Sequence, residues 1–91
     1  MAEVAIKMKI LPESTEVDLA KLKTACEKEI AAFGGEVHKV EEQPIAFGLK
    51  ALEFMFILDE SKGGTDALEE KLVTLSGVRS AEVVDVRRLF G

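Results

Sequence analysis

The sequence Leu49-Lys50-Ala51-Leu52-Glu53-Phe54-Met55-Phe56-Ile57-Leu58 contains the strongest strand signal of the chain. From Leu52 onward a large apolar residue stands at every second position, which is the side-chain period of a β-strand. Met55 and Ile57 make the other face of the segment apolar as well. Strands that are apolar on both faces are typical of the interior of a sheet, so we expect residues 49–58 to form a central strand.

The residues before this strand predict a strand and a helix. Residues 4–10 alternate apolar and mainly charged side chains, which predicts a strand that Pro12-Glu13-Ser14 ends. Apolar residues at spacings of three and four then predict an amphipathic helix. Asp18 is suited to cap the first turn of this helix, and Gly34-Gly35 to end it. The apolar stripe consists of Leu19, Leu22, Cys26, Ile30 and Phe33.

Residues from about Glu36 to Phe47 predict an irregular strand. Pro44 confines the end of this strand to a sheet edge or a bulge, because proline has no amide to donate to a neighbouring strand. A turn at Phe47-Gly48 then leads into the central strand.

The residues after the central strand predict a second helix and a last strand. Lys62-Gly63-Gly64 is typical of a turn, and Asp66 with Glu69 three residues later resembles a capping box. Leu68, Leu72 and Leu75 form the expected buried stripe, and Gly77 ends the helix. Residues from Val78 to about Arg87 predict the last strand.

The order strand-helix-strand occurs two times in succession, which predicts a ferredoxin-like split β-α-β sandwich in the α+β class. Right-handed connections place both helices on one face of a four-stranded antiparallel sheet, with the first and third strands in the middle. The Phe47-Gly48 turn then lies at the end of the sheet where the fourth strand begins, and Arg87-Arg88 lies at the opposite end. For strands of about eight residues the two ends are roughly 25 Å apart.

Length and composition bound the class of protein. The 91 residues suffice for one domain, which we expect to cover residues 1–91. A net charge of −5 disfavours direct nucleic-acid binding and anionic membrane surfaces, which attract proteins with a surplus of lysine and arginine. A single cysteine, Cys26, is typical of a reducing cytoplasm. No apolar run approaches the about 20 residues of a membrane span, so we expect no membrane association.

The chemistry-bearing side chains do not form an enzyme's constellation. Cys26 lies on an apolar helix stripe, so we interpret it as a core residue. His38 is the only histidine and lacks the spaced partners of a metal site. The turn at Lys62-Gly63-Gly64-Thr65 lacks the full phosphate-loop pattern. We therefore expect no catalytic residues, no metal and no cofactor.

Two exposed contact points are the main functional candidates. Phe47 beside Gly48 is either a turn residue folded over the core or an exposed anchor. Arg87-Arg88 is either a solvated strand end or a basic tip, followed by the apolar Leu89. Points at opposite ends of a small sheet suit one large partner better than one small active site.

The chain resembles the archaeal elongation factor 1-beta family over its whole length, and more distantly the nucleotide-exchange domain of the eukaryotic elongation factor 1-beta subunit. The resemblance rests on five segments taken together and in order. They are Leu11-Pro12-Glu13-Ser14, Val17-Asp18-Leu19, His38 to Leu49, Gly63-Gly64-Thr65-Asp66 and Val86-Arg87-Arg88-Leu89.

The resemblance implies a guanine nucleotide exchange factor that replaces GDP by GTP on elongation factor 1-alpha without binding nucleotide itself. It implies that the aromatic residue matching Phe47 packs on one domain of that GTPase. It further implies that a basic residue, matching Arg88, reaches the magnesium and phosphate site, with Arg87 as the rival position. Arginine stands here where relatives often carry lysine, and Phe90-Gly91 extend past it. A cytoplasmic monomer is expected.

Two other classes of function stay open. The same sandwich recurs as a small-ligand-binding dimer, and Met55 and Ile57 on the open face of the sheet would suit sheet-to-sheet pairing. A metal-dependent or acid-base enzyme is the second class, and it is disfavoured because no Ser/His/Asp or Cys/His set is present in a plausible pocket.

Overall fold

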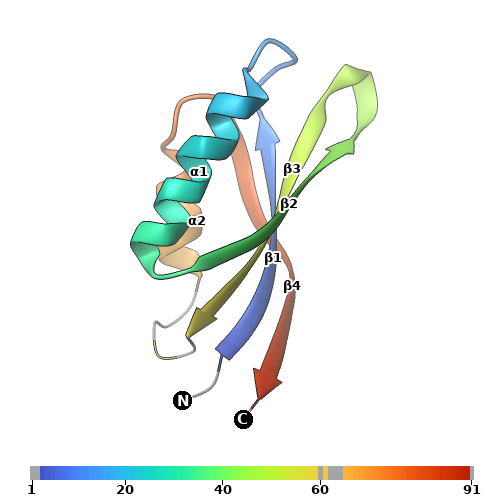
Figure 1. Cartoon of the computed structure of the whole chain (residues 1–91). Helices are drawn as coiled ribbons and strands as arrows, with labels where there is room; N and C mark the ends of the chain where they lie inside the picture. The colour runs from blue at the N-terminus through green and yellow to red at the C-terminus, as the bar shows by residue number, and fades with distance from the viewer. Residues whose placement is uncertain (1–2, 60, 62–64, 91) are drawn as a thin grey trace.

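The structure, a computed structural model, describes residues 3–59, 61 and 65–90. Two helices and a short 3-10 turn alternate with four strands in the order expected (Figure 1). The elements are β1 (Glu3–Pro12), α1 (Leu19–Phe33), β2 (Glu36–Pro44), η1 (Ala46–Gly48), β3 (Lys50–Asp59), α2 (Asp66–Val73) and β4 (Val78–Phe90). Neither described helix is long and apolar enough to cross a bilayer.

The sheet has the order β2-β3-β1-β4, and every neighbouring pair is antiparallel. β1 and β3 are therefore the inner strands, as their patterns predict, and both helices cover one face of the sheet (Figure 1). The prediction of a ferredoxin-like α+β sandwich is confirmed.

The core lies between the helices and the covered face of the sheet. Every second residue of β3 from Leu52 to Leu58 is buried in it, and the stripe of α1 meets them through Leu22, Cys26 and Ile30. Leu19 and Phe33 pack at the margin of this core. The buried residues that form this core cluster are Ile6, Met8, Ile10, Leu22, Cys26, Ile30, Leu52, Phe54, Phe56, Leu58, Leu68, Leu72 and Val78.

The predicted ends of α1 are confirmed. A carboxylate oxygen of Asp18 accepts hydrogen bonds from the amides of Ala20 (3.0 Å) and Lys21 (3.3 Å), which fixes the first turn. Gly34 ends the helix with a positive φ of 105°, a conformation that glycine adopts without steric cost.

The capping box predicted for α2 is wrong. Asp66 is the first residue of the helix, and Thr65 before it has helical backbone angles. The Thr65 hydroxyl donates to the Glu69 carboxylate at 3.4 Å, and Thr65 makes no side-chain hydrogen bond that caps the helix. Leu75 lies beyond the end of the helix and is half-buried. The Lys62-Gly63-Gly64 turn lies outside the described residues.

The two edge strands differ in regularity. β2 ends at Pro44, three residues before the predicted end at Phe47, because residues Ala46–Gly48 form a 3-10 turn. The edge position predicted for Pro44 is confirmed, and the strand is interrupted once, between Val37 and Lys39. β4 runs three residues beyond Arg87, and its pairing with β1 shifts at three places. At each shift one residue of β4 has no opposite partner in β1; these residues are Arg79, Val84 and Leu89.

Candidate partner-binding surfaces

The two predicted contact points lie at opposite ends of the molecule. Ser80, near the start of β4, pairs with Leu11 of β1, and Arg88 pairs with Val4 at the other end of the same strand. The turn between β2 and β3 lies at the first of these ends (Figure 1). The molecule is 41 Å along its longest axis. We call these ends the Phe47 pole and the arginine pole.

The turn at the Phe47 pole presents its aromatic side chain to solvent. Phe47 is 94% exposed, so the alternative in which it folds back over the core is wrong. Its backbone has a positive φ of 60°, which is uncommon for a bulky residue, and Gly48 follows with a φ of 77°. Two consecutive left-handed residues reverse the chain, which explains why a glycine stands beside the aromatic residue.

A recess of about 340 Å³ opens beside Phe47. Its apolar wall comes from Leu11 at the end of β1 and from Ile45 and Leu49, which flank the turn. Ser80 and Glu82 of β4 also line this recess and make part of its lining polar. The exposed aromatic residue is thus accompanied by a hollow with both apolar and polar walls, which a partner side chain could enter.

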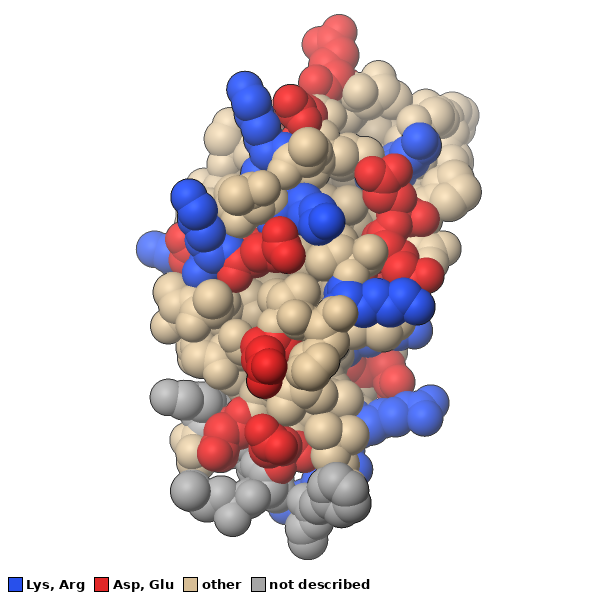
Figure 2. Space-filling model, viewed as in Figure 1, with Lys and Arg blue, Asp and Glu red and all other residues tan. Residues whose placement is uncertain are grey.

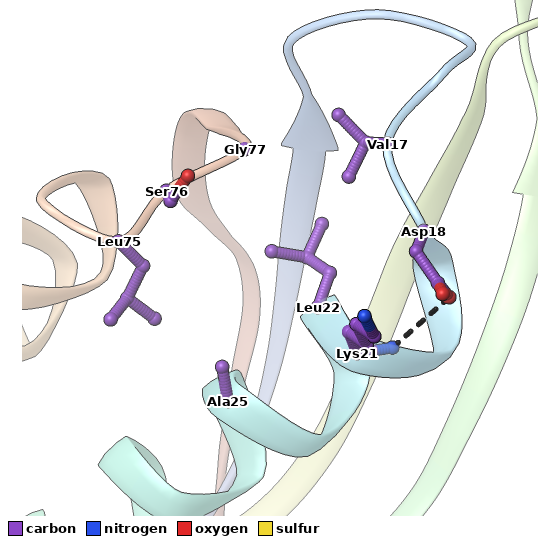
Figure 3. Close-up of a pocket in the computed structure, with 8 residues that line it drawn as sticks. All are labelled: Val17, Asp18, Lys21, Leu22, Ala25, Leu75, Ser76 and Gly77. Atoms are coloured by element: carbon purple, nitrogen blue, oxygen red, sulfur yellow. Dashed lines mark hydrogen bonds between the residues drawn. The ribbon is translucent and has the colours of Figure 1, made fainter.

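A second recess, of about 390 Å³, lies between the start of α1 and the turn before β4 (Figure 3). Val17, Leu22 and Leu75 form its apolar wall, and Asp18 at its rim caps α1. The β1–α1 loop is joined to this turn by a hydrogen bond from the Glu13 amide to the Gly77 carbonyl oxygen at 2.9 Å. This recess was not predicted, because it forms between segments about 60 residues apart in the chain.

At the arginine pole the two arginines lie on opposite faces of the sheet. Arg87 pairs with Ala5 and Arg88 with Val4, so their side chains alternate. Arg87 donates from Nε to the Asp85 carboxylate at 3.0 Å, an exposed ion pair. Arg88 shares its face with the residues that point toward the helices. Leu89 is exposed where the pairing shifts.

The open face of the sheet carries mixed charges. Lys7 lies 3.6 Å from the Glu53 carboxylate, and Lys39 lies 3.8 Å from that of Glu41. The pair of Arg87 with Asp85 belongs to the same face, and Met55 is half-buried there. On the face seen in Figure 2 basic and acidic side chains are likewise interspersed.

The side chains considered for catalysis lie apart from one another. Cys26 is fully buried in the core, as predicted, and burial together with Glu29 and Glu27 raises the pKa of its thiol to about 12. His38 is exposed, with Nε2 3.8 Å from the Glu36 carboxylate. Within the part of the chain that the structure describes, no group of three or more His, Cys, Asp or Glu residues could hold a metal ion.

Comparisons with known proteins agree with the fold and with the motifs. The model of the EF-1 guanine nucleotide exchange domain matches residues 5–89. A protein named elongation factor 1-beta from Methanobrevibacter smithii is 48% identical over 90 residues, which are 99% of this chain and 100% of that protein. The protein of the same name from Methanothermobacter thermautotrophicus is 47% identical over the same shares.

A solved structure shares the fold. It is LarC2, the C-terminal domain of a cyclometallase involved in the synthesis of the NPN cofactor of lactate racemase. The TM-score is 0.59 over 99% of this chain, at 9% sequence identity, and the match spans 58% of that chain. At this identity the likeness concerns the fold alone.

Proposed function

The chain belongs to the family of EF-1 guanine nucleotide exchange domains, and we propose that it promotes GDP release from, and GTP loading onto, elongation factor 1-alpha. The observation that carries the proposal is the match over nearly the full chain to relatives named elongation factor 1-beta. We assign this function to a single exchange domain over residues 1–91, acting as a monomer in the cytoplasm.

Exchange requires that the factor bind the nucleotide-free GTPase more tightly than the GDP-bound form. A ligand shifts an equilibrium only by its differential affinity for the two states. In a GTPase the nucleotide is held by a magnesium ion that bridges its phosphates and by loop amides. A cation placed beside that site repels the metal and competes for the groups that hold it.

We assign the two poles different roles in this process. Phe47, supported by Gly48, anchors the factor on one domain of the GTPase through an exposed aromatic surface that costs little to desolvate. Arg88 reaches the magnesium and phosphate site of another domain, and Leu89 adds an apolar contact beside it. The distance between the poles allows one partner to be gripped at two places at once.

We assign the tip to Arg88 because its position matches the basic residue of the family, with Arg87 as the rival. The two arginines lie on opposite faces of the sheet, so they should not be interchangeable. Arg88 pairs with Val4, near the end of the described strand. An arginine there offers a planar fork of donors to phosphate or carboxylate oxygens.

The proposal is tested by following the release of a fluorescent GDP analogue from the GTPase elongation factor 1-alpha of the same organism. Substoichiometric amounts of this protein should accelerate the release, because an exchange factor is not consumed. The isolated protein should neither bind nor hydrolyse GTP. Measurable nucleotide affinity of the protein alone by calorimetry, or release that is unchanged at equimolar protein, would contradict the proposal.

A further inference from the structure

We infer that the GTPase lies along the outer edge of β4, which connects the Phe47 pole to the arginine pole, and contacts it through the side chains of that strand. This inference rests on the proposed function and adds the side of the molecule that faces the partner. Two poles alone leave four routes between them: the helices, the open face of the sheet, and the edges at β2 and β4.

The first observation is the placement of the arginines. All three arginines of the chain, Arg79, Arg87 and Arg88, lie in β4, whereas all nine lysines lie elsewhere. β4 carries three arginines against two carboxylates, although the whole chain has a net charge of −5. The opposite edge strand, β2, carries three carboxylates and one lysine. A partner with acidic or phosphate groups is therefore complementary to the β4 edge and not to the β2 edge.

The second observation is the placement of exposed apolar side chains. Among the described residues, three of the five large apolar side chains that are exposed belong to β4: Val84 (45%), Val86 (55%) and Leu89 (40%). Val84 and Leu89 stand where the pairing with β1 shifts. Exposed apolar side chains in a strand that contains arginine and no lysine fit the enrichment of arginine and the depletion of lysine at protein interfaces.

The third observation is that β4 reaches both contact points. Ser80 and Glu82, in the first half of the strand, line the recess beside Phe47, and Arg87 and Arg88 near its end form the arginine pole. Arg79 and Arg88 are nine residues apart, which corresponds to roughly 30 Å of extended strand. A partner that covers this edge touches both poles without leaving a gap between them.

The irregular pairing of β4 determines how the edge is used. Shifts at Arg79, Val84 and Leu89 bend and twist the strand, and they break the even spacing that a further strand would need. We therefore expect side-chain contacts and not the addition of a strand from the partner.

The test compares two valines of nearly equal exposure. Val84→Glu places a charge in the middle of the β4 edge, whereas Val73→Glu makes the same change on α2, where the side chain is 43% exposed. The concentration of factor that gives half-maximal GDP release should rise about tenfold or more for Val84→Glu and less than about twofold for Val73→Glu. Val86→Thr keeps the branched shape at Cβ, so it serves as a second variant if Val84→Glu fails to fold.

The arginine at the Phe47 pole gives an independent test. Arg79→Ala should slow association with the GTPase several-fold and reduce the dependence of the rate on salt. The matched control is Lys39→Ala on the β2 edge. This variant should leave the association rate and its dependence on salt unchanged.

The results separate the inference from the proposed function. If the wild-type protein does not accelerate GDP release, the proposed function fails and the inference fails with it. The inference is overturned if the wild-type protein is active and the folded β4 variants promote GDP release as well as it does. It is also overturned if the control variants on α2 and β2 are impaired as much as the β4 variants. In both cases the proposed function stands.

Discussion

The amide of Ile45 donates a 2.8 Å hydrogen bond to the carbonyl oxygen of Leu49, and this bond closes the turn that carries Phe47. A second bond, from the Leu49 amide to the Ala46 carbonyl oxygen at 3.2 Å, lies inside the first. The aromatic ring is therefore held outward by backbone geometry, without support from the core. A preformed anchor loses little conformational freedom on binding.

Phe47→Ala should separate binding from stability. Because the side chain is 94% exposed, its removal should change the free energy of unfolding by no more than about 0.5 kcal/mol. Affinity for elongation factor 1-alpha should fall, since an exposed aromatic residue contributes to an interface and not to the core. Denaturant unfolding and a binding titration measure the two effects.

A buried phenylalanine gives the matched control for this variant. Phe54→Ala empties a fully buried site and should cost roughly 3–5 kcal/mol. If Phe47→Ala costs as much as Phe54→Ala, the ring is part of the core and is not an anchor.

Phe47→Gly and Gly48→Ala should have opposite effects on stability. The positive φ of residue 47 is unfavourable for a bulky side chain, so glycine there should keep stability or raise it by up to about 1 kcal/mol. Alanine at position 48, where φ is 77°, should cost about 1–2 kcal/mol. An added Cβ at Gly48 would lie 3.7 Å from Thr15, which is ordinary contact, so the loss would be conformational and not steric. A destabilised Phe47→Gly variant would show that the turn has a different geometry.

The elements with a clean period were predictable from the sequence. The predicted bounds of β3 and α1 lie close to the observed ones because the large apolar residues that face the core recur at a regular period in each. The start of α2 was predicted wrongly. Asp66 and Glu69 fit the sequence pattern of a capping box, but the backbone of Thr65 before them is already helical. Cap geometry depends on the backbone angle before the helix, which no spacing of residues reports.

The candidate surfaces were predictable only in part. The positions of the two poles follow from topology, and the opposite faces of Arg87 and Arg88 follow from alternation. The extension of β4 to Phe90 was missed because three shifts in its pairing break the period of two on which a strand is recognised. The recess between Val17 and Leu75 requires contacts between distant loops, which local patterns do not contain.

The buried thiol should make stability fall at alkaline pH. The pKa of Cys26 rises from 9.0 to about 12 on folding, because burial disfavours the thiolate. Between these values the unfolded chain releases the proton while the folded chain keeps it, so the free energy of unfolding decreases as pH rises. The slope contributed by this one group approaches about 1.4 kcal/mol per pH unit. At pH values about one unit or more below 9 it contributes little slope, because the thiol is then protonated in both states.

Cys26→Ala isolates this effect from the titration of the lysines. The variant loses packing in the core by an amount that does not depend on pH, but it should lack the extra slope. Denaturant titrations of both proteins between pH 8 and 11 give the difference directly. Parallel curves for the two proteins would mean that the thiol ionises as easily in the folded state.

Arg88→Ala should reduce exchange more than it reduces binding, because the proposed role of this side chain is to disturb the magnesium and phosphate site. Arg87→Ala should have the smaller effect, since that side chain lies on the other face of the sheet. If Arg88 competes with the magnesium ion at this site, a higher magnesium concentration should deepen the loss of GDP release caused by Arg88→Ala. The magnesium dependence of Arg87→Ala should run parallel to that of the wild type. The measurement is the rate of GDP release against magnesium concentration for the three proteins, with binding affinity measured alongside. Equal losses that do not depend on magnesium would mean that the arginine pole supplies only general positive charge, and the choice of Arg88 would be wrong.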